Sequence, residues 1–122
     1  MKENIAKEKA LDFSVRIVNL QKYLRREKKE FTLSDQIMRS GTAIGANIAE
    51  AEFAFSERDM LSKLHIALKE AAETLYWLQL LCRTGFITEK EYQSLADECL
   101  ELKKILVAST NTLSVKVSGK KI

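Results

Sequence analysis

Acid–base, nucleophilic and metal chemistry would depend on histidine, cysteine and hydroxyl side chains, and this chain spaces them poorly for such work. The only histidine, His65, has Ser62 three residues before it, so the Glu-x-x-His pairs of a di-iron helical bundle are absent. Cys82 and Cys99 lack Cys-x-x-Cys spacing. No serine or cysteine stands at helical spacing with both a base and an orienting acid. We therefore predict a protein that is not an enzyme and that uses no metal and no cofactor.

Phosphate binding by a glycine-rich loop is also excluded, because the four glycines form neither G-x-x-x-x-G-K nor G-x-G-x-x-G. What remains is clustered positive charge, with candidate nucleic-acid-binding residues near the end of the first predicted helix and in the C-terminal segment. These are Lys22, Arg25, Arg26, Lys28, Lys29, Lys116, Lys120 and Lys121. The first five have an alternative interpretation as a solvated helix end, whose cations lie favourably near the negative end of the helix dipole.

Overall charge does not decide between these interpretations. The 122 residues contain 20 Lys and Arg against 17 Asp and Glu, and three of the lysines follow Asn111 in a segment without acids. Removing these three leaves 17 basic against 17 acidic residues. A nucleic-acid contact would therefore come from local clusters of charge rather than from net charge.

The segments that could direct the chain to a membrane are missing from the sequence. The first residues, MKENIAKEKALDF, carry cations but no apolar core of a signal peptide. The longest apolar-rich run, residues 75–82, is far shorter than the ~18 residues of a membrane span. Together with two cysteines placed on apolar helix faces, this predicts a cytoplasmic protein with reduced thiols and no membrane contact.

Apolar residues recur at alternating spacings of four and three, which is typical of helices in a bundle. The spacing predicts helices over about 4–29, 33–54, 57–83 and 89–110, and the chain contains no proline. Asn4 and Thr32 are candidate caps, while Ser56-x-x-Asp59 and Thr88-x-x-Glu91 have the form of capping boxes. Short connections favour an all-α, antiparallel up-down-up-down four-helix bundle in one domain, residues 1–110. Residues 111–122 are predicted to form a basic, flexible tail.

The predicted helix 33–54 carries a second stripe, of small and polar residues, about 100° from its apolar one. Two glycines within this helix suggest a close approach of another helix. We predict that the polar stripe and its neighbour Arg39 hold helices or subunits in register, through Gln36, Arg39, Ser40, Asn47 and Glu50. Arg39 and Glu50 are three turns apart, so any bond between them would have to cross helices or subunits. The alternative is a solvent-exposed polar face.

The predicted helix 57–83 is apolar on all sides over residues 75–82. One face can pack inward, and the others need cover as well. Tyrosine and tryptophan are enriched at subunit interfaces, so we predict that Tyr76 and Trp77 belong to one. The alternative is a wide core face with isolated surface aromatics.

Two segments together, QIMRSGTAIGANIAEA and KLHIALKEAAETLYWLQLL, followed by GFI, resemble the bacterial family of 23S rRNA intervening-sequence proteins. The resemblance covers about residues 13–106. Its most specific positions are Gln36, Arg39, Ser40, Ile44, residues 47–50, Ala67, residues 73–75 and Gly85. Ala51 departs from the pattern, because the family often has glycine there, and this affects only local packing.

The resemblance implies a four-helix bundle that assembles as a homo-oligomer, commonly a pentameric ring. It extends to the accessory protein of diversity-generating retroelements, which looks like a basic, barrel-shaped pentamer that binds nucleic acid and a reverse transcriptase. Two functional hypotheses follow. One is a non-enzymatic homo-oligomer that binds RNA or DNA through basic surface clusters; the other is an assembly scaffold or adaptor that binds a protein partner without nucleic acid.

Overall fold

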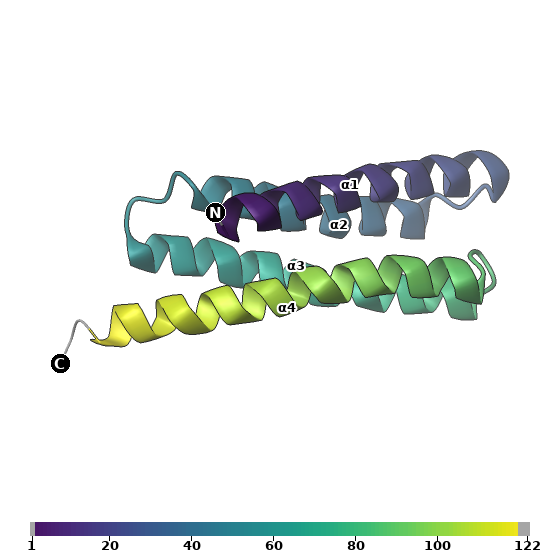
Figure 1. The fold of residues 1–122 in the computed structure, drawn as a ribbon. Coiled ribbons are helices and arrows are strands. Elements are labelled where there is room, and N and C mark those ends of the chain that lie inside the picture. The colour runs from purple at the N-terminus through teal and green to yellow at the C-terminus, as the bar shows by residue number, and fades with distance from the viewer. Residues whose placement is uncertain (1, 120–122) are drawn as a thin grey trace.

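Each predicted helix has a face of apolar or small residues, and in the structure these faces meet in one core. The computed structural model describes residues 2–119, and the side chains of residues 5–119. It contains α1 (Lys2–Glu27), α2 (Thr32–Ala51), α3 (Glu57–Arg83) and α4 (Glu89–Gly119). The helices run alternately in opposite directions (Figure 1), so the prediction of an all-α, antiparallel four-helix bundle is confirmed.

The core draws fully buried side chains from all four helices. They include Phe13, Ile17 and Leu24 of α1, Ile37 and Ile44 of α2, Leu78 and Leu81 of α3, and Leu102 and Leu106 of α4. Burying each contributes about 1.5–3 kcal/mol relative to exposure. Helix α2 packs along both α1 and α3, and α3 packs along α4, whereas α1 and α4 share the smallest contact of the four pairs.

Helices α1 and α2 approach closely where α2 carries its glycines. A Cβ atom at Gly41 would lie 2.9 Å from Cγ1 of Ile17, which is too close for an unmoved neighbour. At Gly45 the nearest atom to such a Cβ would be the Cβ of Ala10, at 3.4 Å. The predicted close approach is therefore confirmed, and Gly41 is the tighter of the two positions.

Two of the predicted caps form and two do not. The Thr88 hydroxyl accepts a hydrogen bond from the Glu91 amide at 3.1 Å, and the Glu91 carboxylate accepts one from the Thr88 amide at 2.7 Å. The Ser56 hydroxyl likewise accepts from the Asp59 amide at 3.0 Å. Asn4 and Thr32, in contrast, both lie inside their helices, so those predictions were wrong.

The predicted ends of α1 and α2 were too late by two and three residues. Helix α1 ends at Glu27 because Lys29 takes a left-handed backbone conformation, with φ of 54°. An L-residue pays about 1–2 kcal/mol for this conformation, and glycine does not. Gly85, two residues after the end of α3, has a φ of 83°, which glycine adopts without this cost.

Helix α4 continues to Gly119 and does not end near residue 110, so most of the predicted flexible tail is helical. The apolar face persists because Thr110 and Leu113 are buried one and two turns beyond Leu106. Thr110 fits there because its hydroxyl donates to the carbonyl of Val107 at 3.1 Å. A polar residue on the apolar face hid this continuation in the sequence. Lys120 and Lys121 lie outside the described residues.

The two glycines of α2 should respond to alanine in opposite directions. Gly41→Ala should lower the free energy of unfolding by about 1 kcal/mol, because overpacking against the buried Ile17 costs about 1–3 kcal/mol and outweighs a helix-propensity gain of about 1 kcal/mol. Gly45→Ala, with room for the methyl group, should raise it by about 0.5 kcal/mol. Urea denaturation followed by circular dichroism measures both. Equal free energies of unfolding for the two variants would show that α1 and α2 move apart at no cost to admit a methyl group at Gly41.

Candidate functional site

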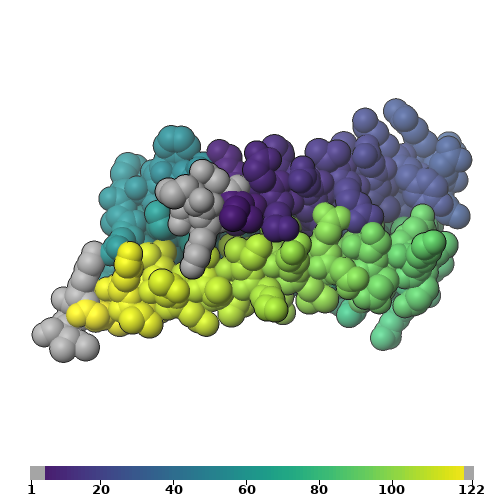
Figure 2. All heavy atoms as spheres, viewed as in Figure 1, coloured from purple at the N-terminus to yellow at the C-terminus, as the bar shows by residue number. Residues whose placement is uncertain are grey.

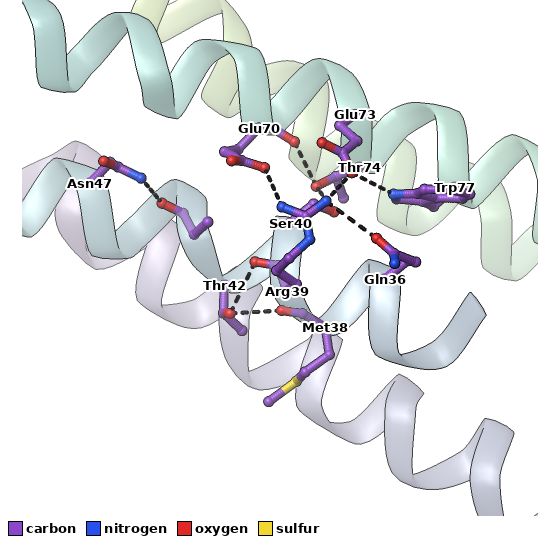
Figure 3. A network of polar contacts seen from close by, with 11 residues as sticks. Gln36, Met38, Arg39, Ser40, Thr42, Asn47, Glu70, Glu73, Thr74 and Trp77 are labelled. Carbon is purple, nitrogen blue, oxygen red and sulfur yellow. Dashed lines mark hydrogen bonds and ion pairs between the residues drawn. The ribbon is translucent and has the colours of Figure 1, made fainter. Parts of the chain in front are cut away.

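The polar stripe of α2 faces α3 and forms an intrachain network there (Figure 3). Arg39 lies between two carboxylates of α3, donating to Oε1 of Glu70 at 3.2 Å and pairing with Glu73. Its guanidinium also donates to the Gln36 amide oxygen at 3.4 Å. Partly exposed ion pairs of this kind contribute at most about 1 kcal/mol each. Their consequence is mainly geometric, since they join α2 to α3 at the surface.

Beneath this ion-pair cluster, the hydroxyls of Ser40 and Thr74 share a fully buried hydrogen bond of 2.9 Å between α2 and α3. The Thr74 hydroxyl donates its one proton to the carbonyl of Glu70 at 2.8 Å when it accepts the Ser40 proton in the shared bond. A buried hydroxyl without a partner would cost about 1–3 kcal/mol. The pair therefore joins α2 to α3 in the core, within one chain.

Asn47 and Glu50 extend the same stripe toward the end of α2. The Asn47 amide donates to the carbonyl of Ala43 at 2.9 Å, so the bond lies within α2 and does not cross to another helix. Glu50 pairs with Lys63 of α3 at 3.3 Å. Glu50 and Arg39 thus each find partners on α3 and none in each other.

Tyr76 and Trp77 differ in how far α3 and its neighbours cover them. The indole Nε1 of Trp77 donates to Glu73 at 3.1 Å, and the ring is half-buried. Tyr76 is 58% exposed and meets Trp77 edge to face, with ring centroids 5.2 Å apart. Contacts within one chain therefore cover much of the Trp77 side chain, whereas the Tyr76 ring faces solvent.

The basic cluster at the end of α1 presents its charge outward. Lys22 and Arg26 are exposed and, four residues apart, lie on one helix face; Lys29 is exposed at the helix end. Arg25 pairs with Asp35 of α2 at 3.1 Å.

Two aromatic rings lie among these cations. The guanidinium of Arg25 is 4.9 Å from the centroid of the Phe31 ring, and the ammonium of Lys28 is 6.0 Å from that of Tyr23. Both are cation–π distances. Phe31 is 49% exposed, and sequence reasoning missed it because it follows the cluster across a turn.

Lys116 lies far from this cluster. The last turns of α4 occupy the opposite end of the molecule from the last turn of α1 (Figure 2). The Lys116 ammonium pairs with Glu57 at 3.8 Å. The structure thus does not bring the predicted C-terminal cation into the α1 cluster of the same chain.

Neither cysteine has the environment of a reactive thiol. Burial raises the pKa of the Cys99 thiol to about 12, and burial with a hydrogen bond to Glu89 raises that of Cys82. Both pKa values are shifted away from those of a nucleophilic thiolate. Within residues 5–119, no group of three or more His, Cys, Asp and Glu residues could hold a metal ion. Over residues 2–119, every helix is too short or too polar for a bilayer crossing.

The buried hydroxyl pair should show energetic coupling. In a double-mutant cycle, Ser40→Ala and Thr74→Val should couple by about 1 kcal/mol, because either change alone removes the shared hydrogen bond. Thr42→Val combined with Thr74→Val is the matched control, since the Thr42 hydroxyl bonds only to carbonyls of its own helix. Denaturant unfolding supplies the free energies. Additive Ser40 and Thr74 effects would contradict the role assigned to this bond.

The two cysteines should differ in accessibility. At pH 8, a thiol reagent should modify half-buried Cys82 slowly and Cys99 only on unfolding, because both thiols stay protonated and Cys99 is enclosed. Mass spectrometry after timed quenching measures the labelling, with Cys82→Ser as the control that leaves Cys99 alone. Rapid labelling of that variant in native buffer would show that the core opens around Cys99.

Comparison with known proteins agrees with the resemblance seen in the sequence. A solved structure of a protein of unknown function from the S23 ribosomal protein family of Bacteroides thetaiotaomicron is similar to this chain, with 55% sequence identity and a TM-score of 0.90. The match covers 91% of this chain and 99% of the other. No curated protein matches.

The model of the family described as 23S rRNA-intervening sequence protein matches residues 2–108, which span all of α1, α2 and α3 and most of α4. The chain belongs to the family of 23S rRNA intervening-sequence proteins.

Proposed function

We propose that this protein is a non-enzymatic homo-oligomer whose subunits present the basic end of α1 to RNA or DNA. The observation that carries the proposal is the outward placement of Lys22, Arg26 and Lys29 at one end of the bundle. Lysine and arginine contacts with phosphate supply most of the affinity in sequence-independent binding. The family resemblance implies a pentamer, which would repeat this cluster five times.

Lys29 gives this interpretation a second support. Its left-handed backbone would favour glycine, and the chain places a cation there at a cost in stability. The alternative explanation, attraction to the helix dipole, gains only about 0.3–1 kcal/mol and is also available to the neighbouring basic residues. A contribution to binding accounts better for a lysine at this position.

The exposed rings of Tyr23 and Phe31 suit a single-stranded nucleic acid. Bases stack on aromatic side chains without sequence preference, and cations alongside hold the backbone. The site lacks the side-chain pattern of base-edge readout, so binding would follow charge and shape. We therefore expect similar affinity for unrelated single strands.

Charge reversal at the exposed cluster should weaken binding. Lys22→Glu with Arg26→Glu should lower affinity for a single-stranded RNA by about tenfold or more at low salt, and should flatten the dependence of log affinity on log salt by about 1–2, because two phosphate contacts are lost. Fluorescence anisotropy across a salt series measures both. RNA and DNA strands of equal length are compared.

Lys69→Glu with Lys104→Glu is the control, because both lysines are exposed and lie outside the cluster. This variant has the same net charge as the cluster variant. Equal weakening by both variants would show that overall charge and not the α1 cluster binds the strand. Weak wild-type binding at low salt, or binding without a salt dependence, would contradict nucleic-acid recognition itself.

A protein scaffold without nucleic acid is the second candidate, and the exposed aromatic side chains favour it. Tyr76 is one, and the connection between α2 and α3 carries two more, Phe53 and Phe55. In this case, purification from the native host should recover a defined protein after nuclease treatment. Recovery of RNA alone would count against it.

A further inference from the structure

The connection between α2 and α3, residues 52–56, holds two phenylalanine rings in solvent; we call it the Phe loop. Phe53 is 83% exposed and Phe55 is 98% exposed. Hydrogen bonds fix the loop backbone, from the Phe53 amide to the Glu50 carbonyl at 3.0 Å and from the Phe55 amide to the Asp59 carboxylate at 3.1 Å. Single exposed apolar side chains are ordinary, but two rings held outward on one short loop form an unpartnered surface.

A pocket of about 260 Å³ lies at the same end of the bundle, and we call it the end pocket. All four helices line it, with apolar walls that include Ala6, Ile48, Ala51, Leu64 and Leu113. For scale, an apolar cavity of about 150 Å³ takes up benzene. The end pocket is therefore large enough for a phenyl ring.

The last turns of α4 make one wall of this pocket. Thr112, Leu113 and Lys116 line it, and all three lie beyond residue 108, where the family match ends. The α2–α3 connection and these last turns are neighbours at one end of the molecule (Figures 1 and 2). Loop and pocket are thus presented on the same end of every copy.

The charges beside the two surfaces are mostly of opposite sign, and Glu52 belongs to both, since it is part of the Phe loop and lines the pocket. The Phe loop and the first turn of α3 carry Glu52, Glu57 and Asp59 against one cation, Arg58. Lys116 lines the pocket, and Lys7 pairs with Glu52, which lines it too. Lys7 and Lys116 pair with Glu52 and Glu57 of their own chain, at 2.8 and 3.8 Å. Partly exposed pairs of this kind contribute at most about 1 kcal/mol each, so replacing them with the equivalent pairs between two copies would cost little.

We infer that the Phe loop of one copy inserts into the end pocket of the next, and that a second copy of this chain is the occupant. The inference rests on the proposed homo-oligomer and names its contact. Because the two rings and the apolar walls of the pocket come from different residues of one chain, the contact is heterologous, and repetition closes a ring when the rotation allows. Aromatic side chains in apolar pockets are typical centres of such interfaces.

The test compares the mass of three purified full-length proteins by sedimentation equilibrium. Phe53→Ser with Phe55→Ser should raise the dissociation constant of assembly by about 100-fold or more, since aromatic anchors dominate binding energy. These side chains are exposed, so the subunit fold should persist, which circular dichroism verifies. Ser109 is half-buried and lines the end pocket, so the indole of Ser109→Trp should fill the pocket. This variant should raise the dissociation constant of assembly by a similar factor.

Mixing provides the sharpest readout. The Phe-loop variant keeps its pocket and the Ser109→Trp variant keeps its loop, so an equimolar mixture should regain one junction and form heterodimers that neither protein forms alone. Leu11→Ser is the matched control, an exposed apolar side chain of α1 outside both surfaces, and it should keep the wild-type mass.

The outcomes separate this inference from the proposed function. A monomeric wild type refutes assembly itself. An oligomeric wild type whose Phe-loop variant keeps the same mass overturns only the contact, and would assign the rings to another partner. An equal loss of mass in Leu11→Ser also overturns it, because the effect would then be general loss of surface hydrophobicity.

Discussion

Helix α2 has to fit closely against two neighbours at the same level of the bundle, and the remaining packing depends on this fit. Gly41 meets Ile17 of α1 with no room for a methyl group, and Ser40, the adjacent residue, meets Thr74 of α3 through a buried hydrogen bond. Adjacent residues of a helix point about 100° apart. These two contacts therefore fix both the rotation and the height of α2, and through it the positions of α1 and α3.

Ion pairs at two positions along α2 also join its exposed side to α3. Arg39 pairs with Glu70 and Glu73, and Glu50 pairs with Lys63. Such exposed pairs add little stability, but they join the two helices along this side. The small and polar stripe is thus largely an intrachain helix contact. A subunit interface is better sought where side chains lack intrachain cover, as at Tyr76 and the Phe loop.

The sequence predicted the helices and their core faces because apolar periodicity reports directly on burial. It also predicted the angular position of the Ser40 stripe, but one helix cannot reveal which neighbour lies on a given side. For the same reason Asp35 pairs with Arg25 of α1 and not with Arg39 one turn away. Thr110 concealed the last turns of α4, and Phe53 and Phe55 lie outside any periodic segment, where exposure follows only from the folded loop.

The placement of charge and aromatic residues at opposite ends of the bundle bears on how assembly and nucleic-acid binding could coexist. Contacts through the Phe loop would leave the last turn of α1 in solvent, because the two lie at opposite ends of the bundle (Figure 1). In a closed ring every subunit has the same orientation to the axis, so the basic ends would all lie at the same height. A chain whose acidic and basic residues nearly balance would then carry a circle of cations with a strong local field, and weak contacts from each subunit would add within one bound strand.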